Sequence, residues 1–274
     1  MSGSSAISPT AHYTGYVWAR NGLSHPALQT REGRVLFDAM RPMNAISDAL
    51  GGVTLETYLL TRHRAIDVLL ERAIDQTGVS QVVEVACGLS PRGWRFTRRY
   101  GDQLTYVEAD LPEMAERKRR ALARMGALGE RHRVVKIDAL RDHGPGSLDA
   151  IAAELDPERN LAIITEGLLG YLHSAAVDGI WRRFARTLQR FPRGRYISDL
   201  HLAAVQNVQV RIFRVFLSAF VRGGVYLHFD NAAEGEAALV RAGFEQATVH
   251  QAVTLAPERV PGGTLAHILE ASIR

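Results

Sequence analysis

One stretch of the sequence decides the fold: Val82-Val83-Glu84-Val85-Ala86-Cys87-Gly88-Leu89-Ser90. Residues 82–85 form a short, mostly β-branched run, which is typical of a strand buried on both faces of a sheet. Gly88 follows in a turn, where the absence of a Cβ atom lets a ligand approach the backbone closely. A helical pattern begins at Pro91. This order predicts an open α/β sheet with a nucleotide-like ligand at the carboxyl ends of its strands.

The alternation of short apolar runs with longer helical segments continues beyond this unit. It predicts an α/β fold with a mostly parallel, Rossmann-like sheet of seven strands, helices on both faces and a closing hairpin. Ser174 is placed to cap a helix over 174–189, and Gly243 to end a helix over 232–242. The other predicted strands are residues 104–107, 134–137, 161–165, 195–198, 244–249 and 264–271.

The 274 residues are enough for one large α/β domain. Residues 1–78 are helical in character, notably from Leu55 to Asp75, and are predicted to form an N-terminal extension. Residues 79–274 contain the sheet, and an apolar and basic helical stretch over 202–221 is inserted in it. We expect the two parts to form a single compact unit.

Composition and charge argue against several classes of protein. Apolar residues make up 46% and charged residues 23% of the chain, as in ordinary globular proteins. The chain lacks a run of about 18 apolar residues and the pattern of a secretory signal, so a cytoplasmic protein without a membrane partner is expected. The single cysteine excludes an intrachain disulfide, and the histidines lack metal-ligand spacing, so no metal is expected. The net charge is +4, but the clusters at 116–120 and 182–183 indicate solvated helix faces and no nucleic-acid partner.

The turn lacks two of the glycines that a dinucleotide site uses. The pattern Gly-x-Gly-x-x-Gly seats a pyrophosphate on a helix N-terminus. Its three positions hold Ala86, Gly88 and Pro91 in this chain. The turn therefore disfavours NAD(P) and favours a smaller ligand without phosphates.

An acidic pair ends the second strand. Asp110 lies 22 residues beyond Gly88, where a carboxylate can accept hydrogen bonds from a ribose diol. Glu108 shares its face of the extended chain, so only one of the two is expected to bind the ligand. The alternative is that one or both cap the helix beginning at Pro112.

A third carboxylate, Glu166, directly follows the apolar strand over 161–165. Burial of this side chain is costly unless a cation or several donors meet it. The ammonium group of an amino-acid ligand would satisfy it. The structural alternative is a partner arginine, such as Arg62 or Arg64.

Four segments, in this order, resemble the leucine carboxyl methyltransferase family, which includes O-methyltransferases of polyketide biosynthesis. The likeness covers about residues 60–172, with a weaker one over 10–20. The segments are Thr61-Arg62-His63-Arg64-Ala65-Ile66-Asp67, Glu84-Val85-Ala86-Cys87-Gly88-Leu89-Ser90-Pro91-Arg92, Tyr106-Val107-Glu108-Ala109-Asp110-Leu111-Pro112 and Ile164-Thr165-Glu166-Gly167-Leu168-Leu169-Gly170-Tyr171-Leu172.

The resemblance implies a class I methyltransferase fold, S-adenosyl-L-methionine as cofactor and S-adenosyl-L-homocysteine as product. By matching position, Arg62 would contact the cofactor's carboxylate, with Arg64 as the alternative. Gly88 would line the methionine part, and Asp110 would hold the ribose. Glu166 would lie near the cofactor's amino group or ribose.

The same resemblance places the adenine beside the segment Asp138-Ala139-Leu140, with Asp142 as the alternative if the alignment slips. The family commonly has glycine where this chain has Ala86, which would also line the cofactor. An alanine there is expected to be tolerated if its φ is negative, and cofactor affinity is expected to suffer otherwise.

The acceptor decides whether catalysis needs a base. A carboxylate, with a pKa of about 4, is already ionised at neutral pH, whereas a phenol, with a pKa of about 10, benefits from a base such as histidine. His201 is the candidate base, and a network at a helix start is the alternative for it. A substrate lid is expected over about 200–230. The candidate acceptor-side residues are Arg92, Tyr171, Asp199 and His201.

The sequence thus favours O-methylation of a small molecule, such as a secondary metabolite, with a carboxylate as the preferred acceptor. Phenol, hydroxyl or N-methylation and methylation of a protein C-terminal carboxylate are the enzymatic alternatives. Two alternatives come from other functional classes: an NAD(P)-dependent oxidoreductase, and a cofactor-binding scaffold without catalysis. A homodimer is compatible with the sequence.

Overall fold

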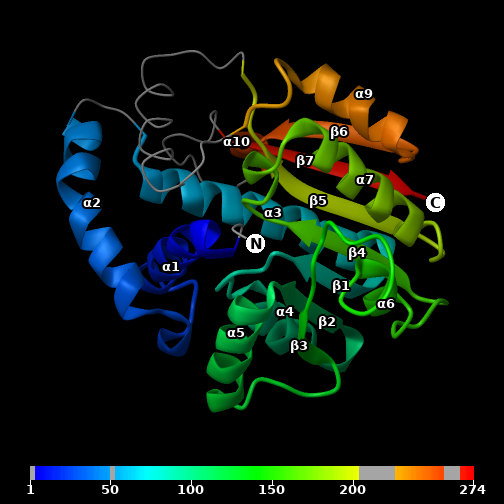
Figure 1. Ribbon diagram of the computed structural model, residues 1–274, viewed down its shortest axis with the longest axis horizontal. Helices are drawn as coiled ribbons and strands as arrows, with labels where there is room; N and C mark the ends of the chain where they lie inside the picture. Colours follow the sequence, from blue (N-terminus) through cyan, green and yellow to red (C-terminus); the bar gives the residue numbers. More distant parts are fainter. Residues whose placement is uncertain (1–3, 50–52, 204–225, 256–265) are drawn as a thin grey trace.

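The computed structural model contains one seven-stranded sheet with helices on both faces (Figure 1). Strands β1 (Val79–Val85) to β5 (Gly194–Leu200) pair in parallel, and β7 (His267–Ile273) runs antiparallel between β5 and β6 (Gln246–Gln251). The order is β3-β2-β1-β4-β5-β7-β6, so the predicted mostly parallel sheet and its closing hairpin are confirmed. The structure describes residues 4–49, 53–203, 226–255 and 266–274.

The remaining strands are β2 (Thr105–Asp110), β3 (His132–Lys136) and β4 (Asn160–Thr165). One face of the sheet packs against α6 (Leu148–Ala152), α7 (Ser174–Leu188) and α9 (Ala232–Ala242). The other packs against α3 (Leu55–Thr77), α4 (Arg92–Tyr100), α5 (Pro112–Arg124) and α10 (Ala252–Leu255). The N-terminal helices α1 (Ser4–Arg20) and α2 (Arg31–Ala49) pack outside α3. Short 3₁₀ helices are η1 (Pro26–Leu28), η2 (Gly101–Gln103) and η3 (Leu169–Tyr171).

The two cores follow from the alternation of side chains along each strand. On β1, Val83 and Val85 belong to the core under α7, where Trp181 and Phe184 are fully buried. Val82 belongs to the core under α3. A strand with buried apolar side chains on both faces is typical of the middle of a sheet that helices cover on both sides, and β1 lies in that position.

Two local predictions are wrong. His173, and not Ser174, caps α7: its backbone is extended, and its side chain accepts a hydrogen bond from the Ala176 N–H at 3.3 Å. The cluster at 116–120 is a solvated face except at Lys118, which is fully buried against the sheet. The predicted stop at Gly243 is confirmed, because this residue ends α9 with a φ of +112°.

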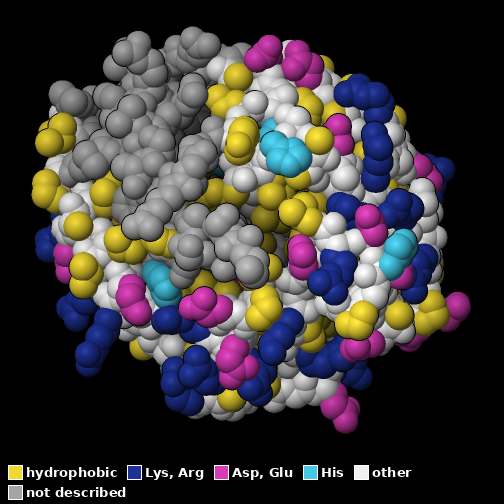
Figure 2. Space-filling view, in the orientation of Figure 1, with side chains coloured by type: hydrophobic (Ala, Val, Ile, Leu, Met, Phe, Trp, Pro, Cys, Tyr) yellow, Lys and Arg dark blue, Asp and Glu magenta, His cyan; other side chains and the backbone are white. Residues whose placement is uncertain are grey.

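The stretch over 205–221, which holds most of the predicted lid, and the start of the strand predicted at 264 lie outside the described residues. Acidic and basic side chains intermingle on the face shown in Figure 2. In the described part of the chain, no helix has the length and apolar character needed to cross a membrane.

Candidate cofactor site

The carboxyl ends of β1, β2, β4 and β5 meet at one edge of the sheet, where four chemically distinctive segments follow them. The turn over 86–90 follows β1, and Asp110 is the last residue of β2. Glu166 comes directly after β4, and His201 after β5. The sheet order therefore brings together residues that are more than 100 positions apart in the sequence.

Asp110 holds the turn directly. One carboxylate oxygen accepts a hydrogen bond from the Gly88 N–H at 2.7 Å, and the other accepts one from Leu111 N–H at 2.7 Å. The N-cap position of α5 is Leu111, without a side-chain cap, so the alternative of Asp110 as a helix cap is not observed. Burial raises the pKa of Asp110, and the two backbone donors counteract part of this rise.

The backbone of the turn is left-handed at two residues. Gly88 has a φ of +50°, and Ala86 has a φ of +56°. The negative φ at which an alanine would be free of strain is therefore not found at Ala86. Among the described residues, Ala86 is the sole non-glycine with a positive φ. Helix α1 lies over the turn: a Cβ atom built on Gly88 would come 3.4 Å from the Ala11 Cβ atom.

Arg62, on α3, lies at the same edge between two carboxylates. Its Nε donates to Glu166 and its Nη1 to Asp199, each at 3.1 Å. Burial alone would raise the pKa of Glu166, but His63, Arg62 and Arg92 lower it well below its usual range. The structural alternative for Glu166, a partner arginine, is thus observed with Arg62. Arg64 is two residues on, about 200° around the helix axis, and is not the residue at this edge.

Arg92, which the sequence predicts among the acceptor-side residues, is buried among carboxylates. Its side chain is 0% exposed, and its three nitrogens lie 2.6–2.7 Å from carboxylate oxygens of Asp67, Glu84 and Glu166. A guanidinium group can be buried only when its donors are used in this way. Arg92, on α4, therefore links α3, β1 and the residue after β4 beneath the site. We call Arg92 and these three carboxylates the Arg92 cluster.

His201 forms a pair with a residue that sequence reasoning did not single out. Its Nε2 lies 2.9 Å from the hydroxyl of Tyr58, which is one helical turn before Arg62 on α3. Burial lowers the pKa of His201. Tyr171 belongs to η3 at the same edge. Burial raises the pKa of its hydroxyl, the charge of Arg62 lowers this pKa, and the charge of Asp199 raises it. The spacing of Tyr58 and Arg62 by four residues was the signal that could have identified Tyr58.

The segment predicted to face adenine forms a turn after β3. The Asp138 carboxylate accepts a hydrogen bond from Leu140 N–H at 3.0 Å, and the Leu140 side chain is 47% exposed. Asp142 instead pairs with Arg183 of α7 at 2.6 Å. No group of three potential metal ligands occurs among the described residues.

The sequence is similar to a known protein family and to several bacterial proteins. The profile of the leucine carboxyl methyltransferase family matches residues 28–185, more than half of the chain. A Frankia alni protein named "Putative S-adenosyl-L-methionine-dependent methyltransferase" is 36% identical over 170 residues, which cover 56% of this chain and 54% of that protein. A Rhodococcus jostii protein with the same descriptive name is 37% identical over 135 residues, covering 49% and 44%. The chain therefore spans about half the length of the curated relatives it matches.

Solved structures share the fold at low sequence identity. A DUF574 family protein from Streptomyces avermitilis has a TM-score of 0.64 and 14% identity, covering 96% of both chains. An O-methyltransferase family protein from Burkholderia thailandensis has a TM-score of 0.55 and 17% identity, covering 99% of this chain and 73% of that one. The fold is that of class I methyltransferases. The length of the profile match and the motifs at the sheet edge lead to one conclusion: this chain belongs to the leucine carboxyl methyltransferase family.

Proposed function

We propose that this protein is an S-adenosyl-L-methionine-dependent O-methyltransferase that acts on a small molecule. The observation that carries the proposal is the Asp110–Gly88 hydrogen bond, which places a carboxylate beside a left-handed glycine turn at the sheet edge. This arrangement suits a ribose and a ligand without phosphates. The names of the curated relatives support the same cofactor.

The residues at the edge fit this cofactor. When bound, S-adenosyl-L-methionine supplies a methyl group on a positively charged sulfonium. Asp110 would orient the ribose with the remaining lone pairs of its carboxylate. Gly88, which lacks a Cβ atom, would leave the backbone open to the methionine part. The exposed apolar side chain of Leu140 would cover the adenine.

The family resemblance favours a carboxylate oxygen as acceptor. A carboxylate is already ionised near neutral pH, so the protein would need to orient it and exclude water. Arg62 is a cation at this edge, although Glu166 and Asp199 already use its Nε and Nη1. Arg211 and Arg214, further candidates in the chain, lie outside the described residues.

A hydroxyl acceptor is the second candidate, and the Tyr58–His201 pair favours it. Burial lowers the pKa of His201, so the ring is neutral at neutral pH and can take up a proton. It could do so at Nδ1, or at Nε2 through the Tyr58 hydroxyl. A phenol or alcohol needs such a base, whereas a carboxylate does not.

The cofactor assignment is tested by calorimetry. We expect the wild-type protein to bind S-adenosyl-L-methionine and not NADPH. Asp110→Asn should weaken binding by about 10- to 100-fold, because hydrogen bonds to a charged group contribute about 1.5–3 kcal/mol. The matched control is Asp102→Asn in η2, at the opposite edge of the sheet, which should bind as the wild type does. Absence of binding at millimolar cofactor would overturn the proposed function.

The acceptor is tested by mass spectrometry of carboxylic acids and phenols after incubation with protein and cofactor. If a phenol is methylated, His201→Asn should lower kcat by about 10²- to 10⁴-fold. The wild type should lose activity only at a pH below the usual histidine pKa of 6.5, because burial lowers the pKa of His201 and protonation of its ring removes the base. If a carboxylate is methylated, His201→Asn should change kcat by less than about threefold. The exposed His143→Asn serves as control.

A further inference from the structure

A fully buried lysine lies behind the cofactor turn. The neighbouring side chains of Arg119 and Arg120 on α5 are 54% and 66% exposed, whereas that of Lys118 is 0% exposed. Its ammonium group forms an ion pair with the equally buried carboxylate of Glu108. It also donates to the Cys87 carbonyl oxygen at 3.5 Å. Lys118 thus reaches from α5, past β2, to the backbone of the turn.

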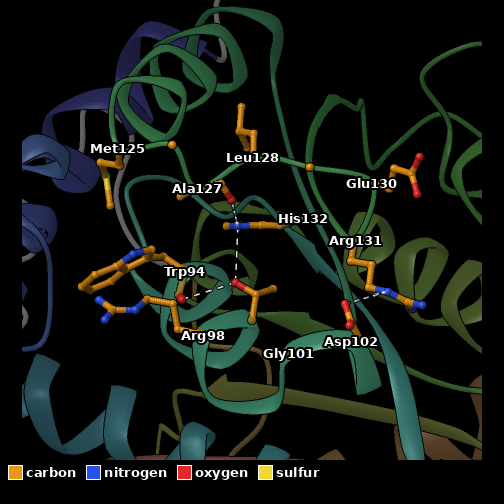
Figure 3. Close-up of a pocket in the computed structure, with 13 residues that line it drawn as sticks. Trp94, Arg98, Gly101, Asp102, Met125, Ala127, Leu128, Glu130, Arg131 and His132 are labelled. Atoms are coloured by element: carbon orange, nitrogen blue, oxygen red, sulfur yellow. Dashed lines mark hydrogen bonds and ion pairs between the residues drawn. The ribbon is translucent and has the colours of Figure 1, made fainter.

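Glu108 is held from its other side by His132, the first residue of β3. One oxygen of Glu108 lies 3.0 Å from His132 Nε2, and His132 Nδ1 lies 2.8 Å from the Ala127 carbonyl oxygen. Burial alone would raise the pKa of Glu108, but Lys118 and His132 lower it, so the carboxylate stays charged. Figure 3 shows the outer end of this series of contacts, where His132 lies beside Ala127. Both residues line a groove of about 660 Å³, and the Thr97 hydroxyl lies 3.5 Å from His132 Nδ1.

Helix α4 packs directly on this group of charges. A Cβ atom built on Gly93 would overlap the Glu108 carboxylate and lie 2.9 Å from His132 Nε2. Both side chains are 0% exposed, and the Coulomb attraction between two charges is larger in such a low-dielectric place than in water. The position of the Lys118 ammonium group is therefore tightly defined.

The turn needs such support because its backbone is strained. A left-handed alanine costs roughly 1–2 kcal/mol, and such a residue persists only where its surroundings impose it. Two carboxylates of β2 support the turn. Asp110 accepts a hydrogen bond from the Gly88 N–H directly, and Glu108 holds Lys118, which donates to the Cys87 carbonyl oxygen. One contact holds a donor of the turn and the other an acceptor.

We propose that Lys118 is a positioning residue, which holds the turn over 86–90 in the shape that binds the cofactor. The inference rests on the proposed function in naming the cofactor, whereas the support of the turn itself can be tested without it. Cys87 gives a direct reporter, because it is the single cysteine of the chain, it lies in the turn and it is 4% exposed.

The experiment measures the rate at which 4,4′-dithiodipyridine, a neutral reagent, modifies Cys87 in the full chain. The variants are Lys118→Met and the double variant Glu108→Gln with Lys118→Met. The single variant leaves Glu108 with one fewer cation and can fail to fold. The double variant removes both charges and keeps the proposal testable. Arg120→Met on the same helix is the control.

We expect the folded double variant to react at least about tenfold faster than the wild type and the control, because opening of the turn becomes easier. Electrostatics does not predict faster labelling: burial raises the pKa of the Cys87 thiol, and Lys118 lowers it by more than Glu108 raises it, so loss of both charges should not speed the reaction. Faster labelling therefore reports movement of the turn. Calorimetry should show S-adenosyl-L-methionine bound at least about tenfold more weakly by the same variant.

The outcomes separate the two proposals. A folded double variant whose Cys87 reacts at the wild-type rate would overturn the positioning role, whatever the cofactor affinity. Faster labelling with unchanged cofactor affinity would also overturn it. Lys118 would then support the turn, but the shape that it imposes would not matter for cofactor binding. If wild-type protein binds no cofactor while the double variant labels faster, the proposed function fails and the support of the turn by Lys118 stands.

Discussion

At the scale of single residues, Ala86 is the position where the chain departs most clearly from what its backbone requires. A left-handed residue favours glycine, and this alanine has a φ of +56°. We expect Ala86→Gly to raise the free energy of unfolding by about 0.5–1 kcal/mol, since the relieved strain exceeds the added entropy of the unfolded chain. Urea denaturation measures the change.

The control for that substitution is Ala237→Gly, at an exposed position within α9. There the backbone is helical, so the same replacement should lower the free energy of unfolding by about 1 kcal/mol. Equal losses of stability in the two variants would show that Ala86 is not strained. Sequence comparison with the family identified this position, but only the structure supplied the sign of φ.

At the scale of elements, Arg92, the first residue of α4, links this helix to three buried carboxylates of other elements. Removing this guanidinium group leaves Asp67, Glu84 and Glu166 buried with fewer cations. We expect Arg92→Leu to lower the free energy of unfolding by about 3–5 kcal/mol, or to abolish cooperative unfolding. Thermal and urea unfolding followed by circular dichroism test this.

The same helix provides the comparison. Arg98 is exposed and lies over the Trp94 ring at 5.1 Å, so Arg98→Leu should cost less than about 1 kcal/mol. A similar effect of both substitutions would mean that the Arg92 cluster contributes little to stability. The sequence pattern placed Arg92 correctly at the start of a helix, but its carboxylate partners come from α3, from β1 and from the residue after β4, which periodicity cannot bring together.

At the scale of the whole molecule, the sequence predicted the sheet and the edge where Gly88, Asp110 and Glu166 meet. It could do so because parallel strands end at a common edge and each residue follows an apolar run. It did not predict the burial of Lys118, since a helical charge run has the same appearance whether or not one member faces the sheet. Nor did it predict the Tyr58–His201 pair, because contact between residues 143 positions apart depends on how α3 packs on β5.

The antiparallel strand between β5 and β6 has a consequence for the order in which the protein is assembled during translation. Strand β6 leaves the ribosome before β7, yet in the described structure it joins the sheet only through β7. Until β7 emerges, both β5 and β6 have an unpaired edge, and such edges are where nascent chains aggregate or recruit chaperones. The parallel part of the sheet, with the cofactor turn, can therefore pair before β7 is made, whereas the pairing of β6 with the sheet waits for β7.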